Sequence, residues 1–189
     1  MNMKTKEITN SLEVLKNQKT ILYPTDTVWG IGCDATSEVA VSKIYDIKQR
    51  SESKSLIILV DGLEMLREYV ESISEEVITL LEASKKPTTI IYNNPKNLAK
   101  NVIASDNTVA IRIVQNDFCK ELIAYLGKPI VSTSANVSGN ETPKSFKEIE
   151  LSILDSVDYV VDLQRNEVCE KSSTILKLGE KGEIIVLRN

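Results

Sequence analysis

Hydroxyl and amide side chains gather in one uncharged stretch, IVSTSANVSG, at residues 130–139. Its β-branched opening predicts a buried strand whose end carries Ser132, Thr133, Ser134 and Asn136. In an extended backbone, Ser132 and Ser134 share one face while Thr133 lies on the other. Hydroxyls and amides donate and accept hydrogen bonds, so this stretch suits a ligand rich in ribose, phosphate or carboxylate oxygens. The alternative is an ordinary turn whose hydroxyls bind the backbone.

Polar side chains also follow a predicted strand in YPTDTVWGIG, at residues 23–32. Pro24 ends the strand, and Thr25, Asp26 and Thr27 come directly after it. Ligands of open α/β sheets often bind where strands end, which makes these groups candidates for a binding site. A turn stabilised by Asp or Thr side chains is the alternative.

Basic residues cluster in IKQRSESK, where Lys48 and Arg50 lie at the end of a predicted helix. Cations at that end are favoured by the helix dipole alone, which is the simpler interpretation. The functional alternative is a phosphate clamp, with Lys48 as a point charge and Arg50 as a planar fork for phosphate oxygens. Lys54 would extend the same basic patch.

An arginine interrupts the apolar strand TVAIRIV, at Arg112. A charged group there is costly unless it is paired or faces a polar cleft. Thr108 and Ala110 share its face of the strand, and apolar residues occupy the other face. The sequence therefore predicts that this face lines a cavity or meets a carboxylate, and it leaves both options open.

Composition excludes several classes of protein. The chain has 189 residues, no histidine and a formal net charge of −4. The lack of histidine rules out a Ser-His-Asp triad and His-ligated zinc, and the acidic balance disfavours a dedicated nucleic-acid binder. The three cysteines, Cys33, Cys119 and Cys169, form no C-x-x-C pair and are predicted to be small buried hydrophobes. The sequence has no P-loop motif and no apolar stretch of about 20 residues, and its polar N-terminal stretch is not expected to be a signal peptide. No metal site is predicted, because Asp26 and Asp34 are the only carboxylates near the polar stretches.

Local patterns predict a one-domain α/β protein that would position these groups on a mixed, twisted sheet. Helices are predicted at 4–17, 37–48, 63–70, 74–83 and 116–126, with caps at Ser37, Ser74 and Asn116 and a stop at Gly127. Ser145 and Glu148 form a capping box that predicts a further helix through about Leu154. Strands are predicted at 20–23, 55–60, 88–92, 108–114, 129–133, 159–163, 173–178 and 183–187.

Taken together, YPTDTVWGIGCDA, the Lys48 and Arg50 pair in IKQR, STSANVSG and the late SST resemble the YrdC family, the L-threonylcarbamoyladenylate synthases. These motifs stand in the family's order and spacing from about residue 21 onward. The resemblance implies a single YrdC-like domain over residues 1–189, with an α/β fold in which a twisted mixed sheet and helices surround a concave cleft. The sequence departs from the family pattern at Trp29, where tyrosine is usual, and at Ser51, 86–88 and Val114.

The resemblance also implies a role for each matching residue. The positions that match the family's L-threonine site are Thr27, Arg112, Ser132 and Ser173. Those that match its ATP site are Arg50, Lys54, Thr108, Ser134, Asn136, Thr142 and Arg188. Lys48 and Arg50 are the catalytic candidates, because they supply positive charge where negative charge develops on the reacting phosphate.

The activity that the resemblance implies is ATP-dependent synthesis of threonylcarbamoyl-AMP from L-threonine and bicarbonate, with release of pyrophosphate. The product would serve threonylcarbamoyladenosine modification of tRNA in the cytoplasm, through a separate tRNA threonylcarbamoyl transferase. Mg²⁺ is expected to arrive with ATP, and weak direct binding of tRNA is a further expectation. Two other functions stay open: a non-catalytic RNA-binding protein that uses the same basic cleft, and a carbamoyl-transfer domain like those of the longer hydrogenase-maturation enzymes.

Overall fold

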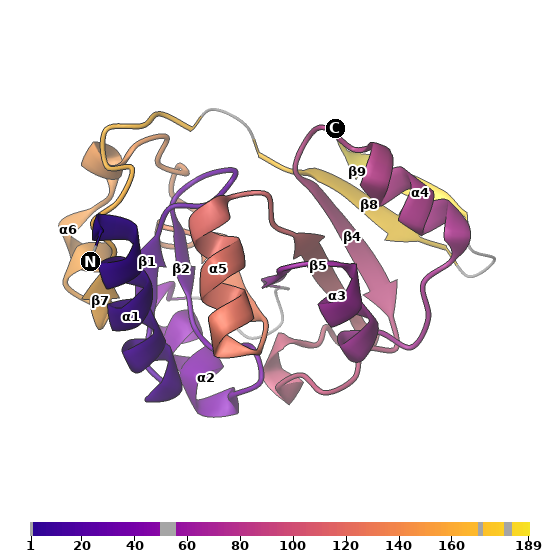
Figure 1. The fold of residues 1–189 in the computed structure, drawn as a ribbon, viewed down its shortest axis with the longest axis horizontal. Coiled ribbons are helices and arrows are strands. Elements are labelled where there is room, and N and C mark those ends of the chain that lie inside the picture. Colours follow the sequence, from indigo (N-terminus) through magenta and orange to yellow (C-terminus); the bar gives the residue numbers. More distant parts are fainter. Residues whose placement is uncertain (1, 50–55, 170–171, 180–182) are drawn as a thin grey trace.

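A mixed sheet forms the centre of the computed structural model, which describes residues 2–49, 56–169, 172–179 and 183–189 (Figure 1). Within these residues the strand order is β7-β1-β2-β6-β3-β5-β4-β8-β9. The strands are β1 (Ile21–Tyr23), β2 (Gly30–Gly32), β3 (Ile57–Val60), β4 (Thr88–Asn93), β5 (Thr108–Ile113), β6 (Ile130–Ser134), β7 (Tyr159–Val160), β8 (Thr174–Leu178) and β9 (Ile184–Arg188). The pairs β1–β7, β3–β5 and β4–β8 are parallel and the others are antiparallel, so the predicted mixed α/β sheet is confirmed.

The three helix starts predicted from the caps Ser37, Ser74 and Asn116 are confirmed by their capping contacts. The helices are α1 (Met3–Lys16), α2 (Glu38–Ile47), α3 (Leu63–Tyr69), α4 (Glu75–Ala83), α5 (Asp117–Leu126) and α6 (Leu151–Leu154), with short 3₁₀ turns at Lys100–Val102 and Phe146–Glu148. Ser37, Ser74 and Asn116 each accept a hydrogen bond from a backbone N–H in the first turn of α2, α4 and α5. Gly127 ends α5 in the left-handed conformation, with φ of 69°.

The helix predicted from Ser145 to about Leu154 is wrong, because this segment is broken into the Phe146–Glu148 turn and α6. The Ser145 hydroxyl donates to Glu148 at 3.0 Å, so it does not accept a bond from the backbone as an N-cap would. The other Glu148 oxygen accepts from the backbone N–H of Lys144 at 2.9 Å. The two side chains thus bind each other and the preceding loop, and no capped helix starts here.

Strand β2 was not predicted, because its two glycines weaken any strand pattern. The structure nevertheless places it between β1 and β6, antiparallel to both. A Cβ atom on Gly32 would lie 2.4 Å from the carbonyl oxygen of Val131 and 2.6 Å from a ring carbon of Tyr23. Glycine is therefore required by the close approach of the neighbouring backbone, a contact that no local pattern reveals.

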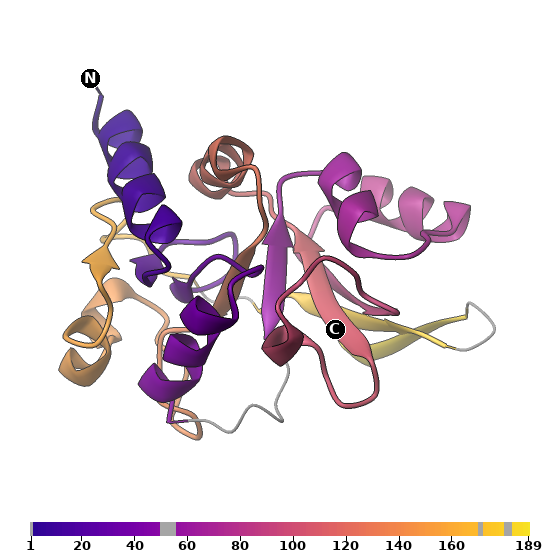
Figure 2. The same ribbon diagram turned by 90° about the horizontal axis from the view of Figure 1, so that it is seen from below.

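Two apolar clusters hold the sheet and helices together. One joins α1 and α5 to β1, β3 and β6, through residues such as Leu15, Ile21, Leu59 and Leu122. The larger one extends from α2 across the sheet to α3 and α4. Figure 2 shows α1, α5, α3 and α4 along one side of the sheet, with α2 on the other. None of the helices in the described ranges has the length and hydrophobicity needed to cross a membrane.

Candidate active site

A cavity of about 350 Å³ lies where β2, β3, β5 and β6 meet the segment 142–144 and the residues Cys169, Ser172 and Ser173. It is lined by Thr27, Val28, Gly30, Ile57, Arg112, Ser132, Thr133, Ser134, Thr142, Lys144, Cys169, Ser172, Ser173 and Arg188. All four residues predicted to hold L-threonine are in this lining. So are Ser134, Thr142 and Arg188 from the predicted ATP site. The structure thus brings together groups from positions as far apart in the sequence as Thr27 and Arg188.

The end of β6 supplies the hydroxyls of the cavity. Ser132 pairs with Ile57 of β3, and Ser134 pairs with Gly30 of β2, so both serines lie between neighbouring strands. A Cβ atom on Gly30 would lie 3.1 Å from the hydroxyl oxygen of Ser132. Glycine at this position therefore leaves the Ser132 hydroxyl room beside the cavity.

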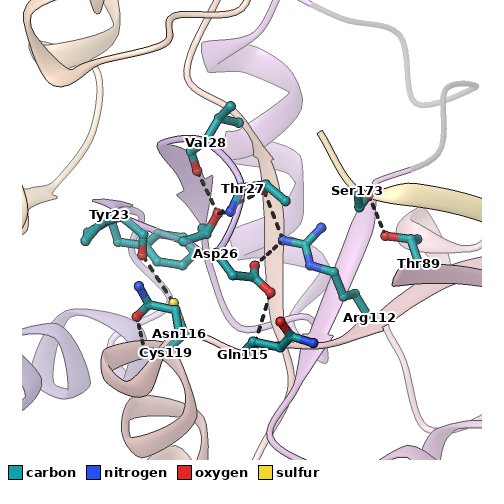
Figure 3. A network of polar contacts seen from close by, with 12 residues as sticks. Tyr23, Asp26, Thr27, Val28, Thr89, Arg112, Gln115, Asn116, Cys119 and Ser173 are labelled. Carbon is teal, nitrogen blue, oxygen red and sulfur yellow. Dashed lines mark hydrogen bonds and ion pairs between the residues drawn. The ribbon is translucent and has the colours of Figure 1, made fainter. Parts of the chain in front are cut away.

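Arg112 of β5 both lines the cavity and pairs with a carboxylate, so both options left open by the sequence occur together (Figure 3). Its guanidinium donates to Asp26 at 3.0 Å and to the hydroxyl of Thr27 at 3.3 Å. The second Asp26 oxygen accepts from the backbone N–H of Gln115 at 3.0 Å. Arg112 is only 3% exposed, and its Nε has no hydrogen-bond partner among the described residues. The ion pair therefore fixes the guanidinium and leaves part of its donor capacity for a ligand.

The turn predicted as the alternative for Thr25 also forms. Its hydroxyl donates to the carbonyl of Val28 at 2.7 Å and accepts from the backbone N–H of Thr27 at 3.1 Å. Figure 3 shows this turn beside Arg112 and Asp26. The turn therefore supports the site, because it holds Thr27 at the cavity wall.

The start of β8 and the end of β9 supply the far wall. The hydroxyl of Ser173 accepts from Thr89 at 2.9 Å and from the Arg188 guanidinium at 3.3 Å, and its carbonyl accepts from Nε of Arg188 at 3.0 Å. Burial, and then the nearby charge of Arg112, lower the pKa of Arg188. An arginine remains protonated at neutral pH even so. Two guanidinium groups thus line this cavity, and the carboxylate that pairs with Arg112, that of Asp26, lies outside the lining, so the cavity suits an anion.

Lys48 and Asn136 lie beneath the end of β6 and are absent from the cavity lining. Lys48 is 2% exposed, and its ammonium donates to the carbonyls of Ser134 at 2.6 Å and Asn136 at 2.7 Å. The Asn136 amide donates to the carbonyls of Val137 and Asn140 at 3.0 and 2.9 Å. Both side chains therefore hold the backbone that carries the Ser134 hydroxyl.

The remaining predicted ATP residues are placed differently. Thr108 lies at the opposite end of β5 from Arg112, outside the cavity lining, and donates to Asp106 at 2.6 Å. Arg50 and Lys54 lie outside the described residues.

Sequence reasoning missed Lys144, Cys169 and Ser172, which also line the cavity. The backbone N–H of Cys169 donates to the carbonyl of Lys144 at 2.8 Å, so two loop segments run side by side here. Cys169 is only half-buried, which corrects the prediction that all the cysteines are buried, whereas Cys33 and Cys119 are fully buried. Burial, and then the charge of Glu167, raise the pKa of the Cys169 thiol.

Acidic residues do not form a metal cage in the described part of the chain. No group of three or more His, Cys, Asp or Glu side chains gathers there. Asp26 is engaged with Arg112, and Asp34 pairs with Lys128 at 2.8 Å and accepts from Thr36. The charged residues that line the cavity in the described ranges, Arg112, Lys144 and Arg188, are all cationic.

Comparisons with known proteins identify the family and the fold of this chain. The Sua5/YciO/YrdC family, described as telomere recombination, matches residues 13–189. A protein of Psychromonas ingrahamii named threonylcarbamoyl-AMP synthase is 33% identical over 150 residues, which cover 78% of each chain. The crystal structure of P. abyssi Sua5 complexed with L-threonine superposes with a TM-score of 0.85 at 26% identity, over 96% of this chain and 53% of that one. The chain thus spans about half the length of that Sua5 protein. E. coli YciO has the same fold, with a TM-score of 0.83 at 22% identity over 97% of this chain and 88% of that one. The chain therefore belongs to the Sua5/YciO/YrdC family.

Proposed function

We propose that this protein condenses L-threonine, bicarbonate and ATP into threonylcarbamoyl-AMP and pyrophosphate. The observation that carries the proposal is the cavity at the end of β6, which is lined by both hydroxyls and cations and, among the described residues, by no carboxylate. Such a lining complements a ligand with several anionic oxygens and a sugar. The relative named threonylcarbamoyl-AMP synthase supports the same activity.

The chemistry suits a protein without histidine. The amine of threonine adds to the carbon of bicarbonate or carbon dioxide and gives a carbamate, with loss of water when bicarbonate reacts. An oxygen of this carbamate attacks the α-phosphorus of ATP, and the bond to the leaving pyrophosphate breaks. The carbamate is already an anionic nucleophile, so little general-base catalysis is needed. The protein must instead bring two anions together and stabilise the charge that develops on the phosphate.

Each side of the cavity has its own role in this scheme. Arg112, held by Asp26, binds the carboxylate of threonine, and Thr27, Ser132 and Ser173 contact the same substrate. Ser134, Thr142 and Arg188 contact the nucleotide. Lys48 and Asn136 hold the backbone of the β6 loop, so the catalytic charge assigned to Lys48 and the nucleotide contact assigned to Asn136 rest on the motif alone.

Arg50 and Lys54 are proposed as nucleotide ligands from the sequence motif alone. The catalytic role of Arg50 has the same basis. Thr108 is also proposed as a nucleotide ligand from the motif. Because Thr108 does not line the cavity, the nucleotide would have to extend beyond the cavity to contact it. Mg²⁺ would be bound mainly by the phosphates of ATP and by water, because none of the described residues that line the cavity carries a carboxylate.

The proposal extends to the place of this reaction in tRNA modification. Residues 1–189 act as a single domain, and the product passes to a separate tRNA threonylcarbamoyl transferase in the cytoplasm. Weak direct binding of tRNA would assist this transfer.

The activity is tested by measuring pyrophosphate release with ATP, L-threonine and bicarbonate each omitted in turn. Release should require all three, since the nucleophile exists only after threonine is carboxylated. Equal release without threonine would overturn the proposal. RNA affinity that falls steeply with salt, without any nucleotide turnover, would instead favour the RNA-binding alternative.

A further inference from the structure

Lys144 lines the cavity, and both the N–H and the carbonyl of its backbone make hydrogen bonds. Its N–H donates to Glu148 at 2.9 Å, and its carbonyl accepts from Cys169 at 2.8 Å. The next residue, Ser145, forms a β-bridge with Val168. The loop therefore holds the Cα of Lys144 in place and leaves the side chain to reach the cavity.

Aromatic packing fastens the same loop to the sheet. The ring of Phe146 lies 4.9 Å from that of Trp29, which is buried beside β2. The guanidinium of Arg165 also lies over the Phe146 ring, 4.5 Å from its centre. Trp29, where tyrosine is usual in the family, thus helps to set the position of the loop that carries Lys144.

The three cations of the cavity lining differ in what they contact. Arg112 is engaged by Asp26, and Arg188 is engaged by Ser173. In contrast, the ammonium of Lys144 makes no hydrogen bond or ion pair within the described residues. The nearby carboxylate of Glu148 already accepts from the Lys144 backbone and from Ser145. The charge of Lys144 is therefore available to a ligand in the cavity.

We propose that the ammonium of Lys144 binds the phosphate chain of the nucleotide and the pyrophosphate that leaves. This inference rests on the proposed function. Thr142, a proposed nucleotide ligand, lies two residues earlier on the same loop, whereas the threonine carboxylate is assigned to Arg112. A lysine binds phosphate as a compact, flexible point charge, which suits a chain that changes shape as pyrophosphate leaves.

The test compares Lys144→Gln with Lys147→Gln, which removes an exposed lysine of the same segment that does not line the cavity. Calorimetric titration with pyrophosphate should show roughly tenfold or greater weakening for Lys144→Gln, the loss expected for a hydrogen bond to a charged group. The KM for ATP should rise by a similar factor, the KM for threonine should change less than about twofold, and Lys144→Arg should recover most of the loss. Lys147→Gln should match the parent.

Parent-like pyrophosphate affinity in Lys144→Gln would overturn the inference, and so would equal weakening in both variants or a rise confined to the KM for threonine. Measurements on the parent protein distinguish failure of this inference from failure of the proposed function. If the parent releases pyrophosphate only with threonine present, the function stands whatever the Lys144 variants do. If the parent lacks that activity, pyrophosphate binding still decides the role of Lys144.

Discussion

Ser134 contributes two atoms to the candidate site, and they have different partners. Its hydroxyl lines the cavity, whereas its carbonyl accepts a hydrogen bond from the buried ammonium of Lys48. The backbone at Ser134 is thus held by Lys48, independently of the Ser134 hydroxyl. A change confined to the hydroxyl should affect the ligand and leave the fold intact.

We therefore expect Ser134→Ala to lower kcat/KM by roughly ten- to a hundredfold, the effect of a lost hydrogen bond to a charged phosphate oxygen. The melting temperature should stay close to that of the parent. Both quantities are measured side by side, with Ser152→Ala on α6, away from the cavity, as the control. A large loss of melting temperature with unchanged kinetics would mean that the hydroxyl supports the loop and not the ligand.

Chemical modification offers a second test at the residue scale. Cys169 lines the cavity with a thiol whose pKa is raised, whereas Cys33 and Cys119 are fully buried. A raised pKa means less thiolate at neutral pH, so alkylation of Cys169 should be slow at about pH 7 and accelerate beyond about pH 9. ATP together with threonine should slow this reaction. Intact-mass measurements over time will show one modified cysteine, and reaction that is unchanged by the substrates would place Cys169 outside the ligand site.

At the scale of elements, β2 determines whether the site can form at all, because it joins the strand that ends at Tyr23 to the strand that carries Ser134. Gly32→Ala should destabilise the protein by about 3 kcal/mol or more, since the new methyl group would overlap backbone and a buried ring. Gly62→Ala is the matched control. Gly62 has open space around it and an extended backbone, so its replacement should change the free energy of unfolding by less than about 1 kcal/mol. Urea unfolding measures both, and equal stability of the two variants would contradict the close packing of β2.

The elements that could be predicted are those with local signals. The caps at Ser37, Ser74 and Asn116 and the β-branched runs of β4 and β5 each carry their own pattern, and all formed as expected. In contrast, β2 and the break before α6 depend on contacts between distant segments. Strand β2, in which two of the three residues are glycine, forms because it pairs with a strand on each side. The helix expected from Ser145 is broken because Glu148 binds the preceding loop and does not complete a helix cap.

The candidate site was predictable to a similar degree. Ser132, Ser134 and Arg112 were found because polar residues in apolar strands are conspicuous. Lys144 and Cys169 were not, because they belong to loops of ordinary composition that reach the cavity only through the pairing of residues 144–145 with 168–169. Charged loop residues acquire a role from where the fold places them, and composition does not encode that place.

At the scale of the whole molecule, the sheet gathers cations and hydroxyls from both ends of the chain, although the net charge is −4. Among the described residues, the charged side chains that line the cavity are all cationic, so their local field opposes the overall charge. Such a focused field raises the local concentration of anionic substrates. The cavity requires no metal cage or histidine of its own, because the proposed reaction consists of positioning two anions and stabilising charge on phosphate.

The most direct test of this account is the identity of the product, determined by mass spectrometry after reaction with ATP, L-threonine and ¹³C-bicarbonate. We predict a single new species that contains AMP, threonine and the labelled carbon, formed in equal amount with pyrophosphate. The same species should be reduced in Ser134→Ala, because that hydroxyl is the one we propose to contact the nucleotide. AMP or ADP that accumulates without a threonine-containing, ¹³C-labelled adduct would contradict the claim that threonine, bicarbonate and ATP react in this cavity.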